Sequence, residues 1–134
     1  MKVLLDTNAY TALFRGHDGI AARVRRAEQV LVSVVVAGEL LFGFRNGSRS
    51  EANREELEEF LASPYVALLP VTLVTADRFG RIAASLRRKG RPLPTNDIWI
   101  AAHAMESGAD LISFDRHFEQ VDGIAWIEPD AGTA

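Results

Sequence analysis

The amino-acid sequence predicts an α/β fold with a central, mostly parallel sheet and helices on both of its faces. The first observation is a continuous apolar run at residues 3–5, which is typical of a strand buried on both faces of a sheet. The second is that segments with strand character alternate with segments of helical periodicity along the whole chain. Such alternation is typical of parallel sheets, because a crossover between parallel strands needs a connection of about the length of a helix.

The predicted elements follow one another without an internal repeat, a low-complexity tract or a domain linker. Five strands are expected at residues 3–5, 30–33, 66–71, 111–114 and 124–127. Six helices are expected at about residues 8–15, 19–27, 34–46, 50–62, 72–89 and 95–107. Glycines are expected to end four of these helices, at Gly16, Gly47, Gly90 and Gly108. The expected N-caps are Ser33, Thr95 and either Thr72 or Thr75.

Composition indicates an ordinary globular protein. With 134 residues, 48% hydrophobic and 25% charged, the chain can bury a core as one domain, which we expect to span residues 1–134 with a flexible tail at 128–134. The absence of cysteine excludes disulfides and thiolate metal sites. The longest apolar run, residues 30–38, is too short to span a bilayer. We therefore expect a cytoplasmic protein without a membrane partner.

Charge is unevenly distributed, although the net charge is only −3. A basic run, Arg87, Arg88, Lys89 and Arg91, is a candidate for contacts with nucleic-acid phosphates. A solvated helix end that complements the helix dipole is an equally good interpretation of this run. Arg15, Arg45 and Arg49 are similar candidates with weaker claims.

Two aspartates follow directly after predicted strands. Asp6 follows the first strand and Asp115 follows the fourth. In open α/β sheets, ligands and chemistry collect at the carboxyl ends of the strands, so both positions suit a reactive carboxylate. Each could instead serve only as the N-cap of the segment that follows it.

Two further acids occupy predicted helices. Glu39 lies inside the apolar segment 34–44, where a lone buried charge is very unfavourable, so it lies either on an exposed stripe or against a cation. Asp97 comes two residues after Thr95 in the first turn of its helix, where it also favours the helix dipole.

A shared site explains all four acids together. Carboxylates that meet within several ångströms repel one another, and this repulsion raises their pKa values. A divalent cation removes the conflict, and oxygen ligands suit Mg²⁺ or Mn²⁺ better than Zn²⁺. Such a site fits metal-assisted hydrolysis of a phosphodiester, with one or two metal ions.

The acids lie in four sequence blocks that can be compared with known families. The blocks are residues 6–8 (DTN), 33–43 (SVVVAGELLFG), 96–102 (NDIWIAA) and 111–115 (LISFD). In order and spacing they resemble the PIN-domain ribonucleases, especially the VapC-type toxins of bacterial and archaeal toxin–antitoxin pairs, over nearly the whole chain.

This resemblance implies a Rossmann-like three-layer α/β/α sandwich and an Mg²⁺- or Mn²⁺-dependent endoribonuclease. By position, the catalytic and metal-binding acids would be Asp6, Glu39, Asp97 and Asp115, with Asn8, Ser113 and Asn96 as supporting residues. The resemblance also implies a homodimer, a VapB-type antitoxin whose tail enters the active-site groove, and RNA, often tRNA, as the substrate.

The three histidines and two other function classes complete the predictions. His17, His103 and His117 show no spacing useful for metal ligation, so we predict that none is a ligand. A haloacid-dehalogenase-like phosphatase also opens with strand and Asp, but Asn8 stands where its second Asp is expected. A non-catalytic, metal-binding receiver-like domain would call for a Lys after a late strand, and residues 113–117 contain none.

Overall fold

The central sheet is entirely parallel. The computed structural model describes residues 1–129, and its five strands are β1 (Lys2–Leu5), β2 (Gln29–Ser33), β3 (Val66–Leu69), β4 (Asp110–Ile112) and β5 (Ala125–Ile127). They lie in the order β3-β2-β1-β4-β5, and each neighbouring pair is parallel. The strand order therefore reverses between β1 and β4, which is where α/β sheets usually bind their ligands.

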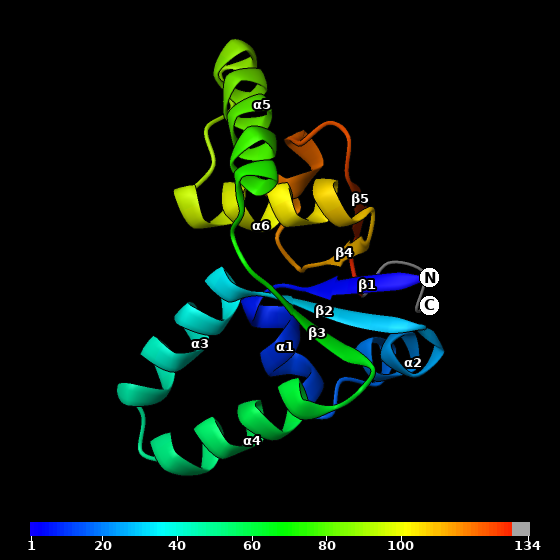
Figure 1. Cartoon of the computed structure of the whole chain (residues 1–134), viewed down its shortest axis with the longest axis vertical. Helices are drawn as coiled ribbons and strands as arrows, with labels where there is room; N and C mark the ends of the chain where they lie inside the picture. The colour runs from blue at the N-terminus through cyan, green and yellow to red at the C-terminus, as the bar shows by residue number, and fades with distance from the viewer. Residues whose placement is uncertain (130–134) are drawn as a thin grey trace.

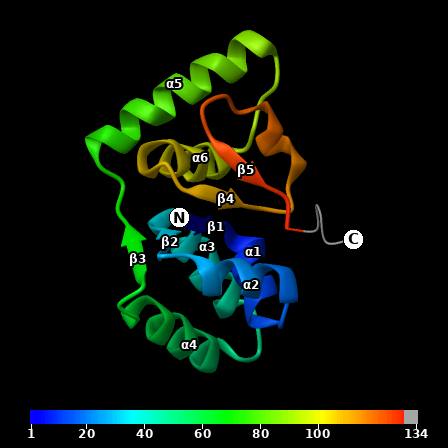
Figure 2. The same ribbon diagram turned by 90° about the vertical axis from the view of Figure 1, so that its right-hand side faces the viewer.

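The helices cover both faces of this sheet. They are α1 (Thr7–Phe14), α2 (Asp18–Arg26), α3 (Val34–Arg45), α4 (Ser50–Ala62), α5 (Leu73–Lys89) and α6 (Thr95–Ser107), with a 3₁₀ helix η1 (Arg116–Gln120). Helices α1 to α4 lie on one side of the sheet, and α5 and α6 lie on the other (Figures 1 and 2). The predicted three-layer α/β/α arrangement is thus confirmed, and the α-helices begin and end within one residue of the predicted bounds.

Some predicted boundaries were wrong for local reasons. Strand β3 ends at Leu69 because the next residue is Pro70, which has no N–H to donate to a ladder. Strand β4 ends at Ile112 because the chain turns at Ser113 toward η1, which the sequence did not predict. Thr95 is the first residue of α6, and Pro94 holds the N-cap position without a side-chain bond.

The core is built on β1 and the strands beside it. Val3, Leu4 and Leu5 are at most 1% exposed, which confirms that the opening run is buried on both faces. Phe118 of η1 is also fully buried. It anchors the segment that carries Asp115 and the residues after it.

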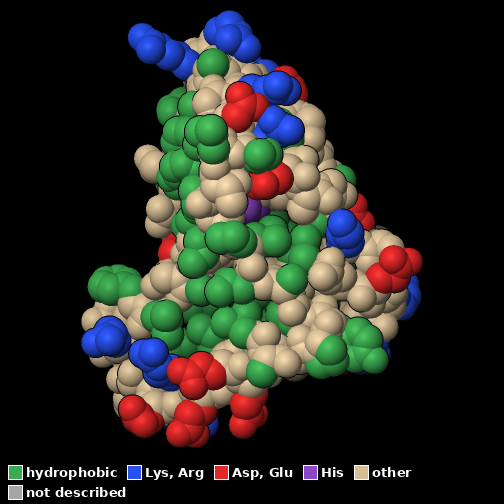
Figure 3. Space-filling view, viewed as in Figure 1, with side chains coloured by type: hydrophobic (Ala, Val, Ile, Leu, Met, Phe, Trp, Pro, Cys, Tyr) green, Lys and Arg blue, Asp and Glu red, His purple; other side chains and the backbone are tan. Residues whose placement is uncertain are grey.

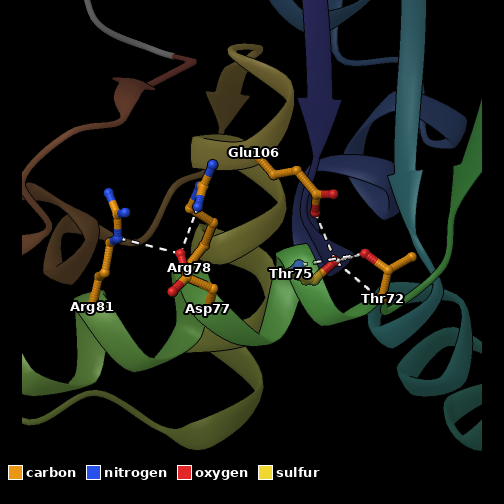
Figure 4. Close-up of polar contacts among 6 residues, drawn as sticks. All are labelled: Thr72, Thr75, Asp77, Arg78, Arg81 and Glu106. Atoms are coloured by element: carbon orange, nitrogen blue, oxygen red, sulfur yellow. Dashed lines mark hydrogen bonds and ion pairs between the residues drawn. The ribbon is translucent and has the colours of Figure 1, made fainter.

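Helix α5 is tied to α6 near its own beginning. Thr72 and Thr75 form a capping box at the start of α5, and Thr75 Oγ1 donates to Glu106 Oε1 of α6 at 2.7 Å (Figure 4). One turn later, Arg78 and Arg81 both pair with Asp77. The rings of Phe79 and Trp99 pack with centroids 4.2 Å apart. The hydrogen bond from Thr75 and the packing of Phe79 on Trp99 hold α6, which carries Asp97, against α5.

The predicted tail begins too early. Glu128 Oε2 accepts from Arg116 Nη1 at 2.7 Å, and Pro129 is buried, so both residues belong to the packed structure. The rest of the predicted tail, residues 130–134, lies outside the described residues. Across residues 1–129, no helix combines the length and the apolar character needed to cross a membrane.

Candidate active site

Asp6 lies at the carboxyl end of β1, where it is only 7% exposed. Its Oδ1 accepts the backbone N–H of Ala9 at 2.9 Å, so it caps α1 as one interpretation of the sequence proposed. The cap uses one carboxylate oxygen. Capping therefore does not exclude a role for Asp6 in a shared acidic site.

Asp115 follows β4, the strand next to β1, and its neighbours in the chain hold it in place. The backbone N–H of Asp115 donates to Ser113 Oγ at 3.0 Å, and Ser113 is completely buried. Asp115 Oδ1 in turn accepts the backbone N–H of His117 at 3.3 Å and caps η1.

His117 lies between Asp97 and Asp115 at the edge of the sheet and contacts both. In the ring of His117, Nε2 lies 2.9 Å from Asp97 Oδ2, and Nδ1 lies 2.9 Å from Asp115 Oδ1. These three residues offer ligand atoms that all lie within 4.8 Å of one another. The contact between Nε2 and Oδ2 is an ion pair when the ring is protonated, and it opposes the rise in the pKa of Asp97.

Glu39 reaches the same place from α3. Thr7 Oγ1 donates to Glu39 Oε1 at 2.6 Å, and Asn96 Nδ2 donates to Oε2 at 3.4 Å. Thr7 follows Asp6 and Asn96 precedes Asp97, so both oxygens of Glu39 are tied to chain neighbours of the other acids. Glu39 therefore does not point away from the site on an exposed stripe.

The electrostatics show that the negative charges act on one another. Burial raises the pKa of Asp6 from 3.8 to about 6; the Ser113 side chain and the Ala9 N–H oppose this shift, and the charges of Asp97 and Asp115 add to it. Burial likewise raises the pKa of Asp97; His117 opposes this shift, and Asp115 and Glu39 add to it. The four predicted acids thus share one site at the reversal of strand order.

The supporting residues differ in part from those predicted. Ser113 and Asn96 contact the acids as described, but Asn8 is exposed, and no hydrogen bond of the described residues joins it to them. Thr7 occupies the supporting position instead. The sequence could not show which of Thr7 and Asn8 faces the acids, because the direction of a side chain in the first turn of α1 depends on the cap geometry.

The structure places His117 beside Asp97 and Asp115, a proximity that the sequence did not indicate, and the prediction that no histidine is a metal ligand stays a prediction. The sequence signal that could have indicated this placement is the Asp115-x-His117 spacing, which is informative only if residues 115–117 form a tight turn. His103 is buried and bonds within the core, at 2.8 Å to Ser33 Oγ and 2.9 Å to Pro70 O. His17 caps α2, since its Nδ1 accepts the N–H of Ile20.

The basic run lies in the last turn of α5 and in the loop that follows it. Lys89 pairs with Asp122 and donates to the Gln120 carbonyl, while Arg87, Arg88 and Arg91 are exposed. Two of the arginines with weaker claims share a cavity with one of the acids. Arg15 and Arg49 line a cavity of about 510 Å³ that Thr7 and Glu39 also line.

The donor set fits a divalent cation. Carboxylate oxygens are the preferred ligands of Mg²⁺ and Mn²⁺ in proteins. Burial is the main cause of the raised pKa values of Asp6 and Asp97, and the neighbouring carboxylates add to it. A cation among Asp6, Asp97, Asp115 and Glu39 would balance their negative charges.

Comparison with known proteins places this geometry in a family. The model of the PIN domain matches residues 3–124. Ribonuclease VapC2 of Haemophilus influenzae is 33% identical over 124 residues, which cover 90% of this chain and 92% of the relative. The tRNA(fMet)-specific endonuclease VapC of Shigella flexneri is 28% identical, covering 92% and 95% of the two chains.

A solved structure extends this similarity to the fold. It is VapBC-5 of Mycobacterium tuberculosis, described as a member of the VapBC family of toxin–antitoxin systems, and it superposes with a TM-score of 0.72. The sequences are 27% identical, with 95% of this chain and 98% of the other covered. The chain therefore belongs to the PIN-domain family, and within it to the group that contains the VapC ribonucleases.

Proposed function

We propose that the protein is an endoribonuclease that hydrolyses RNA phosphodiester bonds with the help of Mg²⁺ or Mn²⁺ and acts as the toxin of a toxin–antitoxin pair. The observation that carries this proposal is the meeting of Asp6, Glu39, Asp97 and Asp115 at the carboxyl edge of β1 and β4. The ribonuclease names of the relatives and the VapBC assembly of the solved relative support it.

Each acid has a stated part in this proposal. Asp6, Asp97 and Asp115 would hold the cation, which when bound polarises the scissile phosphate and lowers the pKa of a water molecule. Glu39, which Thr7 and Asn96 hold in place, would orient the attacking water. Ser113 would keep Asp6 and Asp115 in register.

Substrate and partners follow from the relatives. We infer tRNA as the substrate class, because one relative is named for it. Arg15 and Arg49 in the cavity beside Glu39 would bind phosphates that flank the cut, and the exposed Arg87, Arg88 and Arg91 would bind phosphates farther away. The inhibitory partner would be a VapB-type antitoxin, and the protein would work in the cytoplasm as a single domain over residues 1–134.

The homodimer has a surface on which it can form. Large hydrophobic side chains are exposed around the junction of β3 and α5, at Leu68, Val71, Leu73 and Val74, of which Leu73 is 85% exposed. Figure 3 shows hydrophobic side chains gathered along α5 on this side of the molecule. A second copy of the chain that covered these residues would remove the patch from water.

The phosphatase and receiver-like alternatives receive no support. The PIN-domain model matches most of the chain, and Asn8 lies exposed where a phosphatase would need its second acid. Neither alternative explains why Glu39 and Asp97 join the two acids at the strand ends.

The test is cleavage of total tRNA by antitoxin-free protein with Mg²⁺, with Mn²⁺ and with excess chelator. We expect metal-dependent cutting that Asp97→Asn abolishes. The matched control is Asp18→Asn, because Asp18 is an exposed acid in the first turn of α2 just as Asp97 is in that of α6. Full cutting by a folded Asp97→Asn protein would contradict the proposed role of the acids.

A further inference from the structure

Tyr10 of α1 carries a buried hydroxyl group for which residues 1–129 provide no hydrogen-bond partner. Its side chain is only 2% exposed, and its ring packs against those of Phe14 and Phe60, with centroids 4.5 and 5.6 Å away. A polar group that loses water on folding without gaining a partner lowers stability, so such groups are uncommon and call for an explanation. A ligand that accepts a hydrogen bond from this hydroxyl would provide one.

The hydroxyl belongs to the wall of a cavity between α1, α3 and α4. Tyr10 and Glu56 of α4 both line this cavity of about 510 Å³, a volume within the range of about 300–1,000 Å³ typical of small-ligand sites. Burial, and to a lesser extent the charge of Glu56, raises the pKa of Tyr10, so the hydroxyl keeps its proton at neutral pH. No hydrogen bond joins the hydroxyl to Glu56, so a ligand in the cavity can contact both groups.

The rest of the cavity wall fits a nucleotide. Arg15 and Arg49 offer positive charges to phosphates, and the partly exposed ring of Phe14 offers a surface on which a base can stack. Thr7 and Glu39 line the same cavity, which therefore adjoins the acidic site. An apolar side chain of a protein partner would leave the polar groups of this wall without partners, so the lining favours an anionic ligand with a polar edge.

We propose that this cavity binds a guanosine nucleotide next to the scissile bond, with Glu56 and Tyr10 hydrogen-bonded to the Watson–Crick edge of its base. Guanine alone among the RNA bases presents two N–H donors side by side, at N1 and N2, with the acceptor O6 next to them. The carboxylate of Glu56 would accept from both donors, and the Tyr10 hydroxyl would donate to O6. The inference rests on the proposed ribonuclease function and names the base preference of its site.

The first test compares two nucleotides and needs no substitution. Guanosine monophosphate (GMP) and inosine monophosphate (IMP) differ only in the N2 amino group, which IMP lacks. Each is titrated into the whole chain in chelator, and nuclear magnetic resonance measures the dissociation constant. We expect GMP to bind about tenfold more tightly, because IMP lacks one donor to a charged acceptor. Equal binding of the two, or no binding of GMP at millimolar concentrations, would overturn the inference.

The second test assigns the discrimination to Glu56. Glu56→Gln has one acceptor oxygen in place of two, so it should bind GMP and IMP with similar affinity. The matched control is Glu55→Gln, which changes the neighbouring exposed acid of α4 outside the cavity wall and should keep the wild-type preference. A Glu56→Gln protein that still preferred GMP about tenfold would contradict the assignment.

The third test separates binding from folding at Tyr10. Tyr10→Phe should weaken GMP and IMP alike by about fivefold, because both carry O6, and should leave the melting temperature at or above that of the wild type, because the lost hydroxyl has no partner in the free protein. The control Tyr65→Phe changes an exposed tyrosine outside the cavity and should alter neither quantity. A Tyr10→Phe protein with lower stability and unchanged affinity would show a purely structural role and overturn the assignment.

These measurements are independent of cleavage. A chain that cuts tRNA but binds GMP and IMP equally would contradict this inference and leave the nuclease proposal standing. A chain that prefers GMP but cuts no RNA would retain the guanine site and contradict the nuclease proposal.

Discussion

The network around His103 and the acidic cluster around His117 use similar residues in opposite ways. Nε2 of His103 must donate to the Pro70 carbonyl, so in a neutral ring Nδ1 accepts from Ser33 Oγ, which itself accepts the N–H of Val35. Each polar group in this network has its partner. At the acidic cluster, by contrast, burial and the neighbouring carboxylates raise the pKa values of Asp6 and Asp97, and His117 lies 2.9 Å from both Asp97 and Asp115.

The difference separates a polar region that supports the fold from the one to which we assign the function. A buried network with every partner present stabilises one arrangement of the chain, whereas a cluster with surplus charge lowers stability until a ligand completes it. The His103 network joins the ends of β2 and β3 to α6 and so holds Asp97 from behind. The acidic cluster that this network supports is the polar region whose carboxyl groups keep raised pKa values.

The largest effects are expected at Asp6. Asp6→Asn should reduce metal-dependent cleavage by at least about a hundredfold, because it removes a buried charge that would face the cation. The same change should raise the melting temperature of the metal-free protein at neutral pH. A pKa raised from 3.8 to about 6 corresponds to roughly 3 kcal/mol of lost stability, at about 1.36 kcal/mol per pKa unit. Asparagine can still cap α1.

The sign of this effect sets its pH dependence. Because the pKa of Asp6 is higher in the folded than in the unfolded chain, the carboxyl group destabilises the fold progressively as the pH rises from about 4 to about 6. The stability difference between Asp6→Asn and wild type should therefore be small near pH 4 and full near pH 7. Thermal melts in chelator across this range measure it, and a variant less stable than wild type at pH 7 would contradict the surplus-charge interpretation.

His103→Ala should have the next largest effect, now on stability alone. The substitution leaves a cavity and removes the partners of Ser33 Oγ and the Pro70 carbonyl, so the free energy of unfolding should fall by about 2–4 kcal/mol. Urea denaturation in chelator measures the loss. A loss below about 1 kcal/mol would mean that the network is not the stabilising counterpart of the acidic cluster.

The smallest effects are expected from the arginines. In an Asp97→Asn background, Arg15→Ala with Arg49→Ala should weaken RNA binding about tenfold and make its salt dependence shallower, since both residues line the cavity beside Glu39. Arg87→Ala with Arg88→Ala should have a smaller effect of the same kind. Fluorescence anisotropy at several salt concentrations compares the pairs, and an unchanged salt slope would remove that pair from the RNA path.

Much of the fold could be predicted because local rules agreed with one another. The apolar run of β1, the Ser33 cap and the left-handed glycines Gly90 and Gly108 each act within a few residues, so sequence neighbours suffice to recognise them. The positions of Asp6 and Asp115 at strand ends were accessible for the same reason. The unpredicted η1 and the early end of β3 show where a short turn or a proline overrides the apolar pattern.

The sequence by itself determined the order of the strands and α-helices, the bounds of the α-helices to about a residue, and the four acids that the carboxyl edge of a parallel sheet brings together. Tertiary structure alone decided that Thr7 rather than Asn8 holds Glu39, that Lys89 pairs with Asp122, and that the His117 ring lies between Asp97 and Asp115. The physical reason is side-chain direction. A contact between residues 20 or 57 positions apart depends on the angle at which two elements pack, and no local pattern in the chain encodes that angle.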